Sequence, residues 1–303
     1  MLRSWPGSVR TWAKATPFGD LAILGAAVLS VIVLLIAVAV VPRPPTPARA
    51  VPAFNPGLII SDAAFYDPGT MTVAQVQRFL ESRPCTPKDH SPCLADFRQN
   101  TPSEPLRYAH CAAYRGAASQ SAARIIVSVA RACRINPQVL LVLLQKEQSL
   151  LTHPSASGYL RATGYGCPDT AACNARYYGF FNQLYNAAWQ FREYTVTAPA
   201  WRYHVGRVRI SYHPDATCGS SVVDIQDQAT ANLYNYTPYQ PSPDTVRNPT
   251  VETRCSAFGN LNFWLLFTQW FGSPVTQPFP SGYEPCLNLV GGARCTINPR
   301  TGL

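Results

Sequence analysis

Residues 136–151, NPQVLLVLLQKEQSLL, decide the fold. Asn136 suits the N-cap of a helix, and Pro137 suits the first helical position, whose backbone amide has no partner in any case. Six consecutive apolar residues follow at 139–144, so we expect a helix that is buried on all sides at its start. The run is too short to span a membrane. The chain is therefore predicted to fold around a buried central helix.

Glu147 lies on the apolar face of this predicted helix. Leu143 and Leu144 precede it, and Leu150 and Leu151 follow it, at the spacings of three and four residues that share a helix face. A carboxylate on a buried face is costly unless it is paired or protonated. A carboxyl group removed from water holds its proton more tightly, so Glu147 is a candidate general acid. The alternative is a structural role, in which Glu147 pairs with a buried arginine or binds a loop amide.

The other periodic segments predict a mainly helical protein with irregular loops. Thr72 and Gln75 form a capping box that opens the first of these helices. A single alternating segment, residues 205–212, predicts a strand. The predicted helices, besides the central one, cover residues 73–82, 119–133, 185–194, 222–234 and 260–271.

Residues 21–41 form an uncharged apolar run. At about 1.5 Å per residue it is long enough to cross a hydrocarbon core of about 30 Å. Three basic residues precede it, so the positive-inside rule places residues 1–20 in the cytoplasm. We therefore expect a single-pass protein of the cell membrane with its main domain outside. A cleaved signal peptide is the alternative, because residues 48–50 (Ala-Arg-Ala) have the cleavage pattern.

The part after this anchor divides into four segments. Residues 42–56 contain six prolines and predict a stiff spacer. Residues 57–110 are expected to form an N-terminal brace with one helix and a cysteine-containing loop. Residues 111–272 are the predicted main domain, and residues 273–303 form a C-terminal tail.

All ten cysteines lie after the predicted anchor, and an even number in an exported domain indicates disulfide bonds. The sequence has no CxxC pair, and its five histidines show no ligand spacing, so we expect neither a metal nor a cofactor. The connectivity stays open at this stage. Pairing neighbours in chain order gives Cys85–Cys93, Cys111–Cys133, Cys167–Cys173, Cys218–Cys255 and Cys286–Cys295.

The charge of the chain is basic. Beyond residue 20 there are 22 basic and 15 acidic residues, a net charge of +7. This charge suits contact with anionic wall polymers, although a merely solvated surface explains it as well. Nucleic-acid binding is not expected, because the arginines are scattered and no recognition motif is present.

Three segments after the central helix are rich in aromatic and amide side chains. They are residues 165–169 (YGCPD), 177–183 (YYGFFNQ) and 231–239 (ANLYNYTPY). Aromatic rings stack on sugar rings, and amides bind hydroxyl and acetamido groups, so these segments indicate a carbohydrate cleft. Ordinary core and turn packing is the alternative for each segment.

The order of these motifs resembles the lysozyme-like superfamily of soluble lytic transglycosylases and goose-type lysozymes. Residues 145–149 (QKEQS) match its helix-terminal glutamate, residues 179–183 (GFFNQ) its Gly-apolar-apolar-Gln loop, and residues 233–236 part of its Tyr-Asn segment. More closely, residues 57–272 are similar to a group of actinobacterial secreted or membrane-anchored proteins. These proteins carry QKEQ, GYGCPDT, GFFNQ and YNYTPYQP.

This resemblance implies a lysozyme-like fold and cleavage of the β-1,4 bond between N-acetylmuramic acid and N-acetylglucosamine in peptidoglycan. Glu147 would be the single catalytic acid, with the substrate's N-acetyl group as nucleophile. It would then activate a muramyl 6-hydroxyl or a water, so a transglycosylase and a hydrolase are both implied. Asp169 is the candidate second carboxylate, ahead of Asp224 and Asp227, unless it only serves the turn after Pro168. The implied substrate-binding residues are Gln183, Asn182, Phe180, Phe181, Tyr165, Tyr234 and Asn235.

Two other classes of function fit the same sequence. A non-catalytic glycan-binding or adhesin-like module would use the aromatic cleft without an acid. A structural component of a division or secretion assembly would need neither the aromatic cleft nor the acid. For the enzyme and for the glycan-binding module, the expected partners are peptidoglycan strands. The membrane would be bound through the single N-terminal helix.

Overall fold

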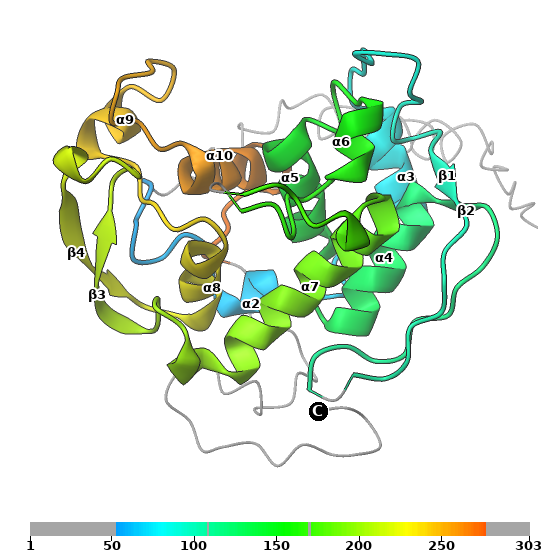
Figure 1. The fold of residues 1–303 in the computed structure, drawn as a ribbon, viewed down its shortest axis with the longest axis horizontal. Coiled ribbons are helices and arrows are strands. Elements are labelled where there is room, and N and C mark those ends of the chain that lie inside the picture. The colour runs from blue at the N-terminus through cyan, green and yellow to red at the C-terminus, as the bar shows by residue number, and fades with distance from the viewer. Residues whose placement is uncertain (1–52, 108, 169–170, 277–303) are drawn as a thin grey trace, which may run out of the picture. The chain divides into compact units, whose positions relative to one another are not determined.

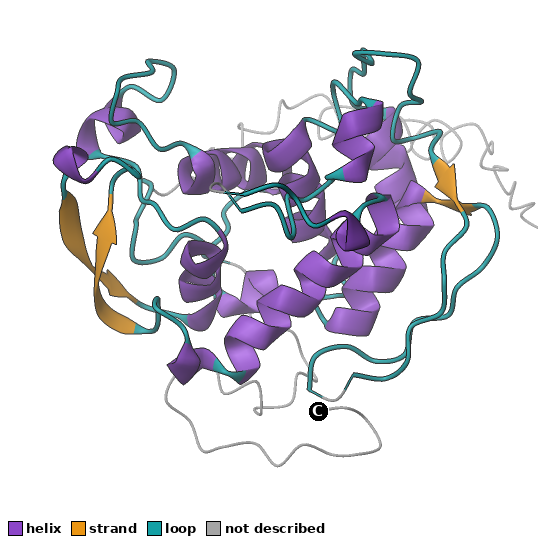
Figure 2. Cartoon of the chain, in the orientation of Figure 1, coloured by secondary structure: helices purple, strands orange, loops and turns teal. Residues whose placement is uncertain are grey.

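The computed structural model describes residues 53–107, 109–168 and 171–276, which are mainly helical (Figure 1, Figure 2). The predicted anchor at residues 21–41 lies outside the described residues, as do most of the spacer and most of the tail. Within the described ranges, no single helix is both long enough and apolar enough to cross a membrane.

The predicted central helix is confirmed as α5 (Pro137–Gln148). The Asn136 side chain accepts a hydrogen bond from the amide of Gln138 at 2.8 Å, as an N-cap does. Residues 139–144 are all at most 1% exposed. The helix ends where Ser149 adopts the left-handed conformation, with a φ of 53°. The apolar run is therefore buried on every side, whereas the last turn of α5 reaches partly exposed surroundings.

Four further helices build the core together with α5. The chain enters α5 from α4 (Ala122–Cys133) through a bend of 120°, and α10 (Gly259–Phe271) packs directly on α5. The long helix α7 (Phe180–Val196) crosses α4 and also contacts α8 (Gln228–Tyr236) (Figure 1). These helices share one apolar core, to which residues of the predicted brace also contribute.

The remaining elements are short. Two antiparallel pairs of strands, β1 with β2 and β3 with β4, lie at opposite sides of the helices (Figure 2). The short helices are α2 (Asp62–Phe65), α3 (Val73–Glu81), α6 (Ala156–Leu160) and α9 (Pro243–Arg247), with 3-10 turns at Ala175–Tyr177, Ala198–Ala200 and Ala216–Cys218. The strands are β1 (Arg98–Gln99), β2 (Gln120–Ser121), β3 (Gly206–Ser211) and β4 (Ser220–Ile225).

One helix prediction is wrong. Residues 222–234 do not form one helix, because residues 222–225 belong to β4, and α8 starts only at Gln228. In β4, Val223 and Ile225 alternate inward while Val222 and Asp224 are exposed, which is the period of a strand. The apolar pattern thus continues from a strand into a helix, although Asp227, the N-cap of α8, separates the two.

Four of the five disulfides that chain-order pairing suggests are present: Cys85–Cys93, Cys111–Cys133, Cys167–Cys173 and Cys218–Cys255. The fifth, Cys286–Cys295, lies outside the described residues. The Cys218–Cys255 bond joins the β3–β4 hairpin to the segment before α10, so α8 and α9 lie inside a covalent loop of 37 residues.

Two buried carboxyl groups meet at the start of α8. Asp227 caps the helix, and its Oδ2 accepts a hydrogen bond from the amide of Asp62 at 3.1 Å. Asp62 Oδ1 accepts in turn from the amide of Ala229 at 2.7 Å. Burial, followed by the charge of Asp227, raises the pKa of Asp62 to about 8, and burial raises the pKa of Asp227 to about 6. The folded protein therefore keeps a proton on this pair at neutral pH.

We expect this pair to make stability fall as the pH rises. Because the folded-state pKa values of Asp62 and Asp227 lie above the ordinary value of 3.8, the stability that their proton contributes is complete below that value. It is lost as the pH rises through about 6 to about 8. Calorimetry should show the thermal midpoint falling across this window, and a flatter profile in Asp62→Asn. Glu252→Gln, at an exposed carboxylate, should keep the wild-type slope. A midpoint that rises across the window contradicts the assignment.

Candidate functional site

Glu147 stands in the last turn of α5, and its side chain is 23% exposed. The carboxylate that the sequence places on a buried face is therefore only partly removed from water. The Leu143 and Leu144 side chains below it are buried, but the carboxylate extends past them toward the end of the helix. A group at this position is accessible to a ligand and is still flanked by apolar packing.

The partner of Glu147 is a lysine rather than the arginine of the structural alternative. Lys146 Nζ lies 2.5 Å from Glu147 Oε1, and the Lys146 side chain is only 6% exposed. The same ammonium donates a hydrogen bond to Thr237 Oγ1 at 3.1 Å, just after α8 ends. The ion pair therefore connects the end of α5 with the end of α8.

A glycine loop lies against the other carboxylate oxygen. A Cβ on Gly164 would stand 3.5 Å from Glu147 Oε2, and Gly164 has a φ of 72°, which favours glycine. Next to this glycine, the Thr163 carbonyl accepts a hydrogen bond from Tyr236 Oη at 2.7 Å. Burial, followed by the charge of Glu147, raises the pKa of Tyr236 well above its ordinary value, so its phenol stays a neutral donor.

Gln183 holds this loop in place. Its Oε1 accepts from the amides of Thr163 at 3.2 Å and Tyr165 at 3.1 Å. Its Nε2 donates to the carbonyls of Tyr165 at 2.9 Å and Tyr177 at 2.8 Å. The side chain is 0% exposed, so it does not line a cleft as predicted. Gln183 instead positions the backbone that lies beside Glu147.

Three other predicted substrate contacts are also buried. Phe180, Phe181 and Tyr234 are at most 1% exposed, and Tyr234 Oη donates to the Pro56 carbonyl at 2.9 Å. These side chains pack the core that supports the site and offer no surface to a ligand in this structure.

The remaining predicted contacts are partly exposed. Tyr165 packs edge-on against Tyr177 with ring centroids 4.8 Å apart. Asn182 donates to the Tyr178 carbonyl at 3.0 Å. Asn235 is bonded on both sides to the backbone of Tyr203, at 3.1 and 2.8 Å. Tyr165 is thus the predicted residue that combines an exposed ring with a place in the loop beside Glu147.

Neither of the two candidate second carboxylates that the structure describes is placed beside Glu147. Asp169 lies outside the described residues. Asp224 is exposed on β4, and Asp227 is buried at the start of α8. The start of α8 lies about 13 Å along the helix from Tyr236, which is next to the loop. In the described part of the chain, the end of α5, the loop at residues 163–165 and residues 236–237 come together near the carboxylate of Glu147.

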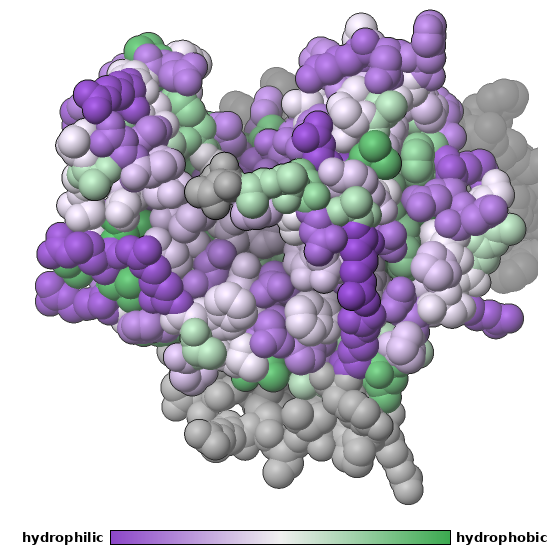
Figure 3. Space-filling view, viewed as in Figure 1, coloured by the Kyte–Doolittle hydropathy of each residue, from purple (hydrophilic) through white to green (hydrophobic). Residues whose placement is uncertain are grey.

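The loop that contains Gly164 and the start of α10 both lie close to the end of α5. In Figure 1 the loop between α6 and α7 passes in front of α5. The space-filling view is hollowed between the part that carries α9, β3 and β4 and the part that carries α5 and α6 (Figure 3). A Cβ on Gly259, at the start of α10, would lie 3.7 Å from Lys146 Nζ. Helices α5, α8 and α10 therefore converge at this ammonium.

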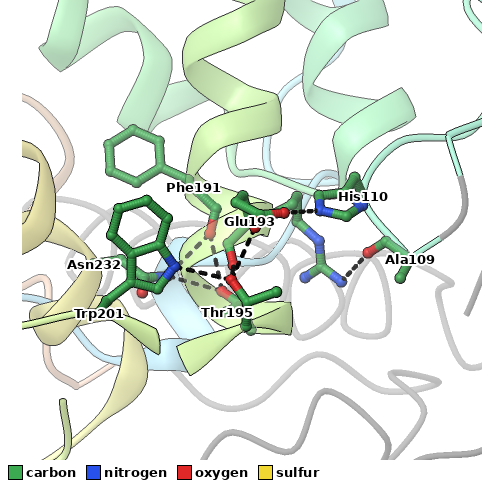
Figure 4. A network of polar contacts seen from close by, with 9 residues as sticks. Ala109, His110, Phe191, Glu193, Thr195, Trp201 and Asn232 are labelled. Atoms are coloured by element: carbon green, nitrogen blue, oxygen red, sulfur yellow. Dashed lines mark hydrogen bonds and ion pairs between the residues drawn. The ribbon is translucent and has the colours of Figure 1, made fainter. Parts of the chain in front are cut away.

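A second acid–base pair joins Glu193 on α7 to His110 in the segment between β1 and β2 (Figure 4). A ring nitrogen of His110 and Glu193 Oε2 are 2.5 Å apart, and the histidine ring stacks on Trp189. The other oxygen of Glu193 accepts from Thr197 Oγ1 at 2.9 Å. Both carboxylate oxygens are therefore engaged, and the imidazole is covered on one face, so this pair serves the scaffold better than catalysis.

Among the described residues, no group of three or more His, Cys, Asp or Glu side chains is arranged to hold a metal ion. Comparison with known proteins gives no match to any family model, any curated protein or any solved structure.

Proposed function

We propose that this protein cleaves the glycan strands of peptidoglycan, at the β-1,4 bond between N-acetylmuramic acid and N-acetylglucosamine, with Glu147 as its single acid–base residue. The observation that supports this most is the meeting of three separate motifs at one accessible carboxylate. Glu147 ends α5, the loop at residues 163–165 is fixed by Gln183, and residues 236–237 approach from α8. The deciding experiment compares the release of muropeptides from sacculi by the wild type and by Glu147→Gln.

The reaction needs only one carboxyl group. Protonated Glu147 donates its proton to the leaving glycosidic oxygen while the N-acetyl group of the substrate attacks the anomeric carbon, forming a cyclic oxazolinium ion. The Glu147 carboxylate then takes a proton from the muramyl 6-hydroxyl or from a water. That oxygen displaces the N-acetyl oxygen and gives an anhydro end or a hydrolysed end. This route suits a site in which one carboxylate has a cation, a glycine loop and a phenol around it.

Lys146 supplies the proton in this proposal. In the free protein its ammonium forms an ion pair with Glu147. A bound glycan excludes water from the pair, and two separated charges become costly without solvent. Transfer of a proton from Nζ to Oε1 removes both charges and leaves a neutral amine and a carboxylic acid. Thr237 keeps the lysine side chain in position during this transfer.

Location is part of the proposal. The predicted anchor at residues 21–41 and the proline-rich spacer would hold the domain outside the membrane, facing the wall. The disulfides support an oxidising compartment, in which such bonds form and persist.

The second candidate function is a non-catalytic glycan-binding module. The observation that favours it is the contact of Lys146 with both Glu147 and Thr237, because a brace between α5 and α8 would look the same. In that case Glu147 contributes to stability and not to bond cleavage.

A double-mutant cycle on Lys146→Met and Glu147→Gln separates these two functions. We expect a coupling free energy of about 1–2 kcal/mol in chemical denaturation, since the pair is partly buried. We also expect Lys146→Met to slow muropeptide release by about tenfold or more, and the double variant to be no slower than Glu147→Gln, because both residues serve one proton transfer.

Lys88→Met, at an exposed lysine, is the matched control and should leave both quantities unchanged. Release at the wild-type rate by Lys146→Met would remove lysine from the mechanism. A coupling free energy between Lys146 and Glu147, together with no muropeptide release by the wild type or by any variant, would favour the binding module.

A further inference from the structure

An open groove of about 860 Å³ is lined by α4 and the segment that connects β1 with β2, and Glu147 is not part of its lining. Figure 1 shows α4, β1 and β2 on the right. Its lining is basic: within the described part of the chain it includes four arginines and no Asp or Glu. The arginines are Arg98, Arg115, Arg124 and Arg131. A groove of this size with one sign of charge concentrates anions.

The four arginines carry positive charge that the described carboxylates do not neutralise. All four side chains are exposed, and none forms an ion pair with a carboxylate among the described residues. Arg98 donates to the Ser119 carbonyl at 2.9 Å, which fixes one guanidinium at the edge of the groove. Several positive charges gathered at one groove attract an anion more strongly than a single exposed charge does.

Helix α4 presents a regular row of polar groups to the groove. Arg124, Ser128 and Arg131 follow one another at spacings of four and three residues, so they share one face. The two arginines are about 10 Å apart along the helix axis. One small anion cannot reach both, whereas a chain with repeated anionic groups can.

The opposite wall of the groove is tightly fixed. A Cβ on Gly116 would stand 2.3 Å from the Thr101 carbonyl oxygen, so this backbone approach requires glycine. Thr101 and Ala117 are joined by a backbone hydrogen bond of 3.0 Å, and Glu104 and Tyr114 by two of 2.9 Å. Alanines 112, 113, 117 and 118 line this side and leave the space open. The groove is therefore formed before any ligand arrives.

We propose that this groove binds a linear chain that carries several phosphate groups. Guanidinium groups bind phosphate oxygens through two parallel hydrogen bonds, and serine hydroxyls and amides complete the contacts. An adjoining hollow shares Arg98 and Ser121 with the groove but also contains Asp96. This carboxylate repels anions, so the chain lies along α4 and does not continue past Arg98 in that direction.

The test uses the full chain in neutral detergent micelles and a short linear polyphosphate as the probe, titrated by calorimetry. Arg124→Gln/Arg131→Gln should weaken binding at least tenfold and reduce its salt dependence. Arg207→Gln/Arg209→Gln removes the same charge from the exposed face of β3 and should change affinity less than twofold. Thermal midpoints of both variants should match the wild type, because the altered side chains are exposed.

Two further probes identify the form of phosphate that is recognised. Orthophosphate should bind much more weakly than polyphosphate, since it reaches fewer arginines. Vesicles of phosphatidylglycerol in neutral lipid test headgroups as the source: binding to them that depends on Arg124 and Arg131 assigns the groove to a membrane surface, and binding of polyphosphate alone assigns it to a soluble chain. Equal weakening by the β3 variant, or polyphosphate binding no tighter than orthophosphate, overturns the proposal.

Discussion

Replacing Glu147 with glutamine is expected to reduce muropeptide release from purified sacculi at least about 100-fold, the usual contribution of a general acid. Glutamine keeps the size of the side chain and can still accept a hydrogen bond from Lys146, but it cannot donate the proton that the leaving oxygen needs. Binding to sacculi should be retained, because the loop held by Gln183 and the tyrosines around it are unchanged. Mass spectrometry of the digest measures release, and pelleting with sacculi measures binding.

Glu193→Gln is the matched control, because Glu193 also contacts a basic side chain, the imidazole of His110, and is equally exposed, at 23%. It should release muropeptides within about twofold of the wild-type rate, since its carboxylate is engaged within the scaffold. If Glu147→Gln cleaves as fast as the wild type, the catalytic proposal for Glu147 fails. If Glu193→Gln loses muropeptide release instead, the pair formed by His110 and Glu193 becomes the candidate site.

Gln183→Ala is expected to destabilise the protein by about 3–4 kcal/mol. The substitution leaves a cavity in the core and removes the partners of two amides and two carbonyls in the loops around residues 163–177. It should also lower muropeptide release, because the loop that these bonds fix places Gly164 against Glu147. Urea denaturation followed by circular dichroism measures the free energy of unfolding.

Asn182→Ala provides the comparison for Gln183→Ala. Asn182 is partly exposed, and its amide donates a hydrogen bond to the carbonyl of Tyr178, so we expect a loss below about 1 kcal/mol. Comparable losses for the two variants would show that the buried amide of Gln183 does not organise the loop. The pair therefore distinguishes a positioning residue from a surface contact, although the two residues are adjacent in the sequence.

The central helix was predictable because its signals are local. An N-cap, a proline at the first turn and an apolar run all lie within residues 136–144, and the chain follows them. The hairpin at residues 206–225 was recognised only in its first strand. Val222 and Val223 fit either a helix or a strand, and pairing with β3, a tertiary contact, decides between the two.

The sequence indicates several residues near Glu147, but it does not indicate what their side chains contact. Adjacent residues on a helix point about 100° apart, so the sequence gives no reason to pair Lys146 with Glu147. The long lysine side chain makes the contact by turning toward Thr237, which is distant in sequence. Gln183 was predicted to face a ligand, but its amide is buried and binds its own loop, an outcome that depends on the packing of the whole chain. The burial of Phe180, Phe181 and Tyr234 has the same cause.

The Cys218–Cys255 bond sets an order of events for the molecule. Residues 236–237 reach Lys146 from inside the ring that this bond closes. Closing a ring of this size lowers the entropy of the unfolded chain by an amount worth about 3–4 kcal/mol. A chain kept in a reducing compartment lacks this constraint on residues 236–237, whereas oxidation supplies it. Under the proposed function, the segment that contacts Lys146 would therefore be fully constrained only after the chain has reached an oxidising compartment.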